Sequence, residues 1–182
     1  MPTETVYGLA GNAYSDKAVK KIFRLKKRPK KNPLIIHYLN INNINQDVVL
    51  NGSFFKLYEK FCPGPITFVL KKNKKSKIVS SATANLNTVA VRFPNHKIIK
   101  LILKSTNFPL AMPSANVSSK LSPTSALDVY ENFGKKLKII INGGASKIGI
   151  ESTVVDLTGK PKILRPGIIS SEDIKKILRT RL

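Results

Sequence analysis

Short apolar runs alternate with amphipathic segments along the chain, and this alternation limits the possible folds more than any other feature. The apolar runs at residues 33–39 and 88–93 are too short for buried helices and are typical of buried strands. Between such runs, Val19, Ile22 and Phe23 repeat at helical spacing. Strands that alternate with helices pack in layers, so we predict a single α/β domain over residues 1–182.

The same pattern places the individual elements. We predict helices at residues 15–25, 54–61, 95–104 and 122–133, and a terminal helix that begins near Ser170 or Ser171. We predict strands at residues 33–39, 66–71, 88–93, 109–112, 137–141, 152–157 and 162–164. The helix at 122–133 is expected to begin at Ser122 because a capping side chain precedes a proline there. The lysine-rich segment before residue 88 is expected to be a mobile loop.

Several classes of protein are excluded by what the sequence lacks. The single cysteine, Cys62, excludes a disulfide framework and a cysteine-rich zinc site. No apolar run approaches the about 20 residues needed to cross a bilayer, so no membrane association is expected. The sequence opens without a secretory signal, so a cytoplasmic location is expected. P-loop, dinucleotide-binding and nucleophile-elbow motifs are also absent.

The net charge of +22 leaves two interpretations open. A strongly basic chain can bind nucleic acid, and a direct contact with tRNA or double-stranded RNA is one hypothesis. However, 26 of the 32 basic residues are lysine, a bias that AT-rich codons also produce, and most lysine runs are solvated surface. Aromatic residues make up only 7% of the chain, which argues against a base-stacking platform.

Polar segments at the ends of the predicted strands carry more information. Each of these segments taken alone fits a turn or a helix cap. Together they supply four separated cations, accompanied by hydroxyl and amide donors: Lys26, Arg28, Arg92 and Arg165. This set of groups fits an anionic ligand that bears both phosphates and a carboxylate.

The polar segments also follow one another in a recognisable order. They read PTETVYGL, K-x-R-P-x-x-N-P-L-x-x-H, TVAVR-x-P, PSAN with SPT eight residues later, G-x-ESTVVD and LRPG, between residue 2 and about residue 170. In this order they resemble the YrdC/Sua5 family of threonylcarbamoyl-AMP synthases, and the chain is similar to the short YrdC type. The resemblance implies a twisted, open, mixed β-sheet with flanking helices around a concave positive cavity. Family members carry a further strand ahead of the first motif, so that N-terminal strand is expected to be missing from this sequence.

The resemblance also implies a reaction and a set of site residues. L-threonine, bicarbonate and ATP, with Mg²⁺ on its phosphates, would yield threonylcarbamoyl-AMP and pyrophosphate for the tRNA nucleoside N6-threonylcarbamoyladenosine. The residues implied in threonine binding are Thr5, His37, Arg92, Met112 and Ser152. The residues implied in ATP binding are Arg28, Asn32, Thr88, Ser114, Asn116, Ser122 and Arg165. Lys26 and Arg28 would be catalytic, since phosphoryl-type transfer depends on positioning and on charge stabilisation.

The implied partners extend beyond the substrates. The product would pass to a threonylcarbamoyl-transferase complex that acts on tRNA. Two alternatives to an active synthase remain open at this point. One is a non-catalytic or truncated relative that binds RNA or ribosomes. The other is carbamoyl transfer, as in the related domain of hydrogenase maturation proteins, although the zinc-finger and acylphosphatase segments of those proteins are absent.

Overall fold

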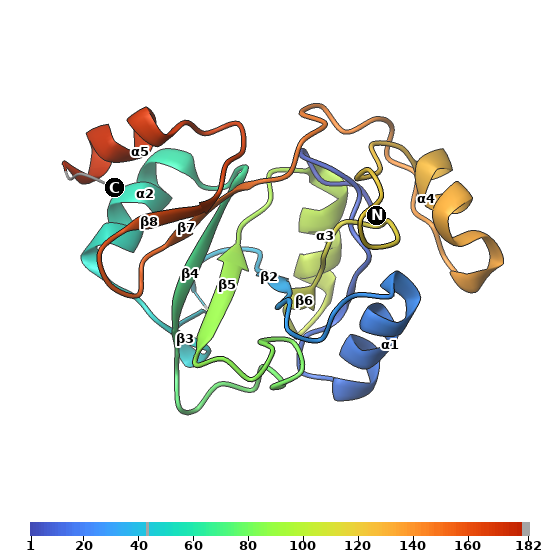
Figure 1. The fold of residues 1–182 in the computed structure, drawn as a ribbon, viewed down its shortest axis with the longest axis horizontal. Helices are drawn as coiled ribbons and strands as arrows, with labels where there is room; N and C mark the ends of the chain where they lie inside the picture. The colour runs from blue at the N-terminus through green and yellow to red at the C-terminus, as the bar shows by residue number, and fades with distance from the viewer. Residues whose placement is uncertain (43, 180–182) are drawn as a thin grey trace.

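A mixed β-sheet forms the centre of the computed structural model, which describes residues 1–42 and 44–179 (Figure 1). The strands are β1 (Gly11–Asn12), β2 (Ile35–His37), β3 (Val48–Val49), β4 (Ile66–Lys72), β5 (Thr88–Arg92), β6 (Leu110–Ala111), β7 (Thr153–Asp156) and β8 (Lys162–Arg165). Their order is β1-β6-β2-β5-β4-β7-β8, and β3 pairs with β4. The β2–β5 and β4–β7 pairs are parallel and the other pairs are antiparallel. The predicted mixed α/β sheet is therefore confirmed.

Five α-helices and two 3₁₀ turns flank the described part of the sheet. The α-helices are α1 (Asp16–Lys26), α2 (Gly52–Phe61), α3 (Lys97–Ser105), α4 (Ala126–Phe133) and α5 (Ser171–Leu178). The 3₁₀ turns are η1 (Ile44–Gln46) and η2 (Gly134–Lys136). Figure 1 shows α2 and α5 side by side near β7 and β8, whereas α1 and α4 lie toward the other end of the sheet. None of the described helices is long and apolar enough to span a membrane.

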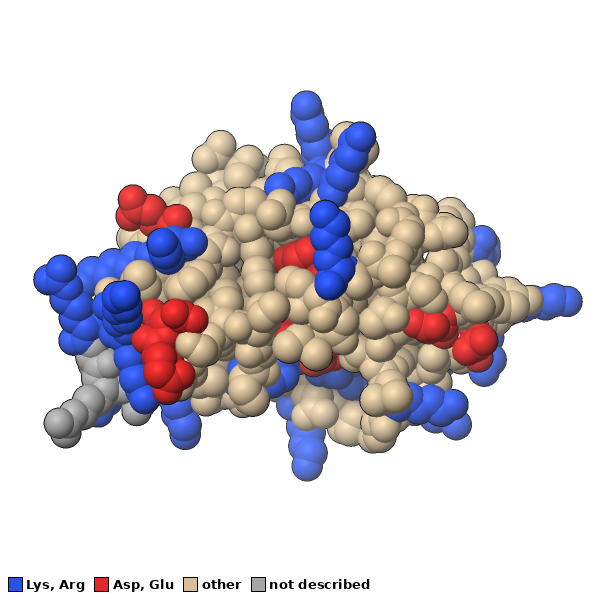
Figure 2. Space-filling view, turned by 90° about the horizontal axis from the view of Figure 1, so that it is seen from above, with Lys and Arg blue, Asp and Glu red and all other residues tan. Residues whose placement is uncertain are grey.

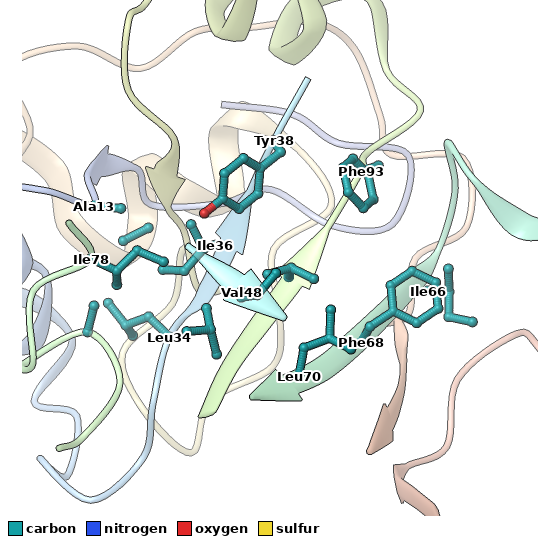
Figure 3. Close-up of a cluster of buried hydrophobic side chains, with 14 of the residues drawn as sticks. Ala13, Leu34, Ile36, Tyr38, Val48, Ile66, Phe68, Leu70, Ile78 and Phe93 are labelled. Atoms are coloured by element: carbon teal, nitrogen blue, oxygen red, sulfur yellow. The ribbon is translucent and has the colours of Figure 1, made fainter. Parts of the chain in front are cut away.

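One face of the sheet carries the main hydrophobic core. Strand pairing aligns five side chains in one row across it, each with 0% exposure: Ala111, Ile36, Val91, Phe68 and Val155. Phe54 of α2 packs edge-on against Phe68, with ring centroids 5.1 Å apart. Figure 3 shows this cluster, in which Ile66, Phe68 and Leu70 project from β4 on the same side. Burial of so much apolar surface dominates the stability of the fold.

The opposite face of the sheet is only partly covered. Because side chains alternate along a strand, the neighbours of the core row point the other way. At the β6 end, Leu110 packs with Ile99 and Leu103 of α3 in a second, smaller apolar cluster. Beyond this cluster, the strands carry both polar and apolar side chains on this face, among them Arg92, Thr67 and Val154. A pocket opens over this part of the sheet.

Two predicted elements differ in the structure. The strand at 137–141 is wrong: the segment has no pairing partner and Ile139 is 78% exposed. The helix predicted from Ser122 begins at Ala126 instead. Ser125 caps it, because its hydroxyl accepts from the backbone N–H of Asp128 while the Asp128 carboxylate accepts from the backbone N–H of Ser125.

The lysine-rich segment before β5 was expected to be a mobile loop, but part of it packs into the main core. Ile78 and Ala82 enter the main core with 2% and 0% exposure. The Lys72 ammonium donates to the backbone carbonyl of Ile78 at 2.7 Å. The two-residue strands β1 and β3 were not predicted, because two residues show no periodicity.

Candidate functional site

On the face of the sheet opposite the main core, strand register aligns four polar residues and one valine in one row. His37 pairs with Arg92, Arg92 with Thr67, Thr67 with Val154, and Val154 with Arg165. Facing residues on neighbouring strands lie only about 5 Å apart. A histidine and two arginines that are far apart in the sequence therefore belong to one surface.

A pocket opens over this row. Its described lining is Thr3, Val6, Gly8, Arg28, Pro33, Ile35, His37, Arg92, Met112, Pro113, Ser114, Glu151, Ser152 and Arg165. The loops around it are joined by backbone hydrogen bonds: Ala115 N–H donates to the Tyr7 carbonyl, and Gly149 N–H donates to the Thr5 carbonyl. The first polar segment of the sequence thus holds both the 113–116 loop and the segment before β7 in place.

Arg92 is buried at the base of the pocket. It is 4% exposed, and its Nη2 donates to Glu4 Oε1 at 2.7 Å, where Glu4 is 7% exposed. The Nε of Arg92 and the Oε2 of Glu4 have no partner in the described structure. A buried polar atom without a partner costs about 1–3 kcal/mol. The guanidinium therefore keeps capacity to bind a further acceptor, such as a ligand carboxylate.

His37 lies beside Arg92 and is neutral. Burial and the charge of Arg92 lower the pKa of His37 to about 3. Its Nδ1 is 3.2 Å from the backbone carbonyl oxygen of Ile35, so this nitrogen carries the proton and donates. A neutral imidazole adds a polar contact to the pocket without adding a charge.

Arg165 closes the pocket from β8. Its Nε and Nη2 donate to the Ser152 carbonyl at 3.1 and 2.9 Å, and its Nη1 forms an ion pair with Glu151. Burial lowers the pKa of Arg165, while the charge of Glu151 opposes that shift. The bonds to Ser152 and Glu151 fix the guanidinium plane relative to β7.

The glycine of the LRPG segment is required by a close approach between strands. A Cβ on Gly167 would lie 2.4 Å from the backbone nitrogen of Thr153 and 2.8 Å from the carbonyl oxygen of Glu151. Contacts of this length with backbone atoms cannot be relieved by a side-chain rotation. Gly167 therefore lets the chain pass next to β7 and so holds Arg165 over the pocket. This role goes beyond that of a glycine in an ordinary turn.

Lys26 is buried inside the wall of the pocket. It is 1% exposed, and its ammonium donates to the carbonyls of Ser114 and Asn116 and, at 3.2 Å, to the side-chain oxygen of Asn116. Burial lowers the pKa of Lys26 to about 8, helped by the charge of Arg28 and opposed by that of Glu151. These contacts use the donors of Lys26 to hold the loop after β6.

Arg28 enters the pocket from the end of α1. Lys27 ends this helix in the left-handed conformation, with φ of 52°, and so turns the chain toward the pocket. Arg28 then donates through Nε to the Asn32 carbonyl and through Nη2 to the Pro33 carbonyl, both at 3.0 Å. These two bonds leave Nη1 of Arg28 for a ligand.

The predicted site residues fall into two groups. Those that line the pocket are Arg28, His37, Arg92, Met112, Ser114, Ser152 and Arg165. Those outside the described lining are Thr5, Lys26, Asn32, Thr88, Asn116 and Ser122. Most of the second group lie close behind it: Ser122 donates to Glu151 at 3.0 Å, and the Thr5 hydroxyl lies 2.9 Å from the Thr3 hydroxyl.

Sequence reasoning missed four polar residues of the site, of which Thr3 and Glu151 line the pocket directly. Glu4 and Glu151 pair with the pocket arginines, and Thr67 places its hydroxyl 2.7 Å from that of Ser152. Thr67 stands as the one polar residue in an otherwise apolar run, which is a signal that could have drawn attention to it. Both glutamates lie inside segments already singled out, but an anionic side chain does not fit the expectation of an anion site.

The fold and the pocket together define a class of protein. Three arginines converge on one cavity over one face of an open mixed α/β sheet, with serine hydroxyls beside them. Arginine binds carboxylates and phosphates through paired N–H donors, so this class is an anion-binding α/β domain.

The comparisons with known proteins specify the family. The Sua5/YciO/YrdC family model, described as "Telomere recombination", matches residues 1–167, and the chain belongs to this family. A threonylcarbamoyl-AMP synthase of Pyrococcus abyssi is 46% identical over 97% of the chain, and one of Bacillus subtilis is 40% identical over 97%. The chain covers 52% and 51% of these relatives, so it spans about half of their length.

Solved structures agree with the fold. The crystal structure of P. abyssi Sua5 complexed with L-threonine matches with a TM-score of 0.93 and 45% identity, over 97% of this chain and 52% of that one. Escherichia coli YciO matches with a TM-score of 0.83 over 95% of this chain and 84% of that one. At 21% identity, the YciO match shows the fold alone.

Proposed function

We propose that this protein synthesises threonylcarbamoyl-AMP from L-threonine, bicarbonate and ATP. The observation that carries the proposal is the convergence of Arg28, Arg92 and Arg165 on one pocket. One guanidinium suits an amino-acid carboxylate, and the other two suit phosphates. Family membership supports the reaction, as does the threonine complex of the P. abyssi relative.

The chemistry proceeds in two steps. The threonine amine adds to the carbon of bicarbonate or carbon dioxide and forms a carbamate, with loss of water or a proton. A carbamate oxygen then attacks the α-phosphorus of ATP, the bond to the β-phosphate oxygen breaks, and pyrophosphate leaves. In this scheme Arg92 holds the threonine carboxylate while Arg28 and Arg165 stabilise charge on the phosphates. Such transfers depend mainly on positioning and on fixed charge, so a catalytic triad is not required.

Magnesium enters this proposal with the nucleotide. The described residues contain no group of three His, Cys, Asp or Glu side chains that could hold a metal ion. In this scheme the ion arrives with ATP as part of the substrate and would neutralise phosphate charge. Mg²⁺ commonly binds in this way, through substrate phosphates and water.

Transfer of the product belongs to the same proposal. Threonylcarbamoyl-AMP is a mixed anhydride that a threonylcarbamoyl-transferase complex would consume when it modifies tRNA in the cytoplasm. On the face shown in Figure 2, Lys and Arg side chains project at several separate places along the outline, among them the left end and the top. On this face the distribution favours a solvated basic surface over a single RNA-binding patch.

The assay follows from the reaction. Purified protein is incubated with Mg·ATP, L-threonine and bicarbonate, and both pyrophosphate and the adenylate are measured. Pyrophosphate release is expected only when threonine and bicarbonate are both present. Release without threonine, or no release from the chain extended to the full length of its relatives, would contradict the proposed function.

Arg28→Ala tests the pocket itself. The substitution removes a guanidinium from the phosphate side of the pocket and is expected to abolish ATP-dependent pyrophosphate release while the far-UV circular dichroism stays unchanged. Arg24→Ala is the matched control, because Arg24 is exposed one turn earlier on α1 and does not line this pocket. Equal activity in the two variants would contradict the role of Arg28.

A further inference from the structure

Glu151 is the acidic side chain in the described lining of the pocket, and the proposed reaction gives it no role. The chain has only ten acidic residues against 32 basic ones, and one of these few carboxylates stands in the pocket. Its Oε2 pairs with Arg165, and its Oε1 accepts from Ser122 at 3.0 Å. Burial acts to raise the pKa of Glu151, but the charge of Arg165 and hydrogen bonds from Ser122 and Ser114 hold it below the usual value.

The partners of Glu151 are groups that suit a phosphate. A guanidinium and a serine hydroxyl converge on one carboxylate, as they would on a phosphoryl oxygen. The carboxylate therefore occupies the position of a bound anion. The charge of Arg165 is paired while Glu151 stays there.

The free volume of the pocket agrees with this occupancy. The cavity measures about 90 Å³. Sites for drug-sized ligands usually measure at least roughly 300 Å³. A nucleotide therefore enters only if side chains move, and the Glu151 carboxylate stands between Arg165 and Ser122, where the phosphates need to be.

We propose that Glu151 is an internal competitor that occupies the phosphate subsite until a polyphosphate displaces it. The identity of the natural ligand as ATP rests on the proposed function, but the competition itself does not. Displacement requires an anion that offers more charge and more contacts than one carboxylate. Glu151 therefore makes the subsite selective for polyphosphates over small monoanions.

Competition within the protein has a predictable size. A competing group on a short tether has an effective concentration in roughly the millimolar range or above. The apparent affinity for an external ligand falls in proportion to the fraction of molecules whose subsite is free. If about one molecule in ten has Glu151 displaced, the affinity for an external anion is reduced about tenfold.

The test is direct binding of inorganic pyrophosphate without magnesium. Isothermal titration calorimetry compares the wild-type protein with Glu151→Gln, which keeps the size of the side chain and removes its charge. We expect the variant to bind pyrophosphate about ten times more tightly, because the competing charge is gone. Glu59→Gln is the matched control, since Glu59 is exposed on α2 and does not line the pocket. This control should bind as the wild type does.

The opposite results are equally informative. Weaker binding by Glu151→Gln would show that Glu151 supports the anion site, for example by bracing Arg165, and unchanged binding would show that it does not compete; either result overturns the proposal. If Glu151→Gln does not fold, Glu151→Asp takes its place: its shorter side chain should also tighten binding, and weaker binding would again overturn the proposal.

The proposal and the proposed function fail separately. Tighter binding by the variant, with no adenylate made by the wild type, would support the competitor and reject the synthase. Adenylate formation by the wild type, with no change in pyrophosphate binding by Glu151→Gln, would support the synthase and reject the competitor. Absence of pyrophosphate binding by both wild type and variant overturns the competitor.

Discussion

Glu4→Gln should strongly destabilise the protein, because Glu4 is the only charge partner that the described structure gives to Arg92. The substitution keeps the shape of the side chain but leaves a guanidinium that is 4% exposed without a counter-charge. At a charge separation of about 4 Å and an effective dielectric constant of 20, the lost attraction is about 4 kcal/mol. Breaking a buried ion pair by removal of one partner typically costs about 3–5 kcal/mol. We therefore expect the free energy of unfolding to fall by about 3–4 kcal/mol.

Urea denaturation at pH 7 measures this loss, with Glu59→Gln as the exposed control. Exposed substitutions usually stay within about 0.5 kcal/mol. A loss of less than about 1 kcal/mol for Glu4→Gln would refute the reasoning, because it would mean that Arg92 is compensated by something other than Glu4.

The double variant Glu4→Leu/Arg92→Met separates stability from binding. It removes both charges and both unpaired buried atoms, and apolar replacement of a buried ion pair is often neutral or stabilising. We expect it to regain most of the stability lost by Glu4→Gln. It should also show no thermal stabilisation by L-threonine, since the guanidinium that would bind the carboxylate is gone. Threonine-dependent stabilisation of the double variant would contradict the assignment of Arg92.

Three further predictions concern the pocket wall. The pKa of His37 is lowered to about 3, chiefly by burial, from 6.5 in the unfolded chain, so the unfolded chain binds more protons below pH 6.5. The free energy of unfolding should therefore fall by about 2 kcal/mol between pH 7 and pH 5 because of His37 alone. Urea melts of His37→Gln should lack this part of the decrease. Lys26→Met should cost about 3 kcal/mol in urea melts, because buried acceptors in the loop after β6 lose their donor; unchanged stability with loss of ATP binding alone would instead place Lys26 on the phosphates. Gly167→Ala should cost about 1–3 kcal/mol through its clash with Thr153, whereas Gly159→Ala, with nothing within 4 Å, should melt close to the wild type.

The sequence predicted the elements that depend on neighbouring residues, such as apolar runs and helix caps. Apolar runs located β4, β5 and β7, and serine caps located the starts of α1 and α5. The prediction of Ser122 as the cap was wrong, and the serine followed by a proline was a plausible cap in isolation. Asp128 decides in favour of Ser125, since only from that position can the two residues satisfy each other's backbone N–H.

Features that depend on pairing could not be predicted. Residues 137–141 have a strand-like composition, but composition does not tell whether a sheet edge is free to accept them. The row from His37 to Arg165 depends on the register of five strands, which no single segment encodes. Half of the residues that line the pocket were named from the motifs, whereas the ion pairs of Arg92 and Arg165 became visible only in three dimensions.

The position of Arg165 on β8 has a consequence for protein synthesis. Among the described residues β8 is the last strand in sequence, and it lies at one end of the sheet, paired with β7. Strands far apart in sequence pair only after the chain between them has been made, and such contacts form slowly. A nascent chain that stops before residue 162 therefore carries His37 and Arg92 but lacks the guanidinium that completes the pocket. Ligand binding would in this way report that translation has passed Arg165.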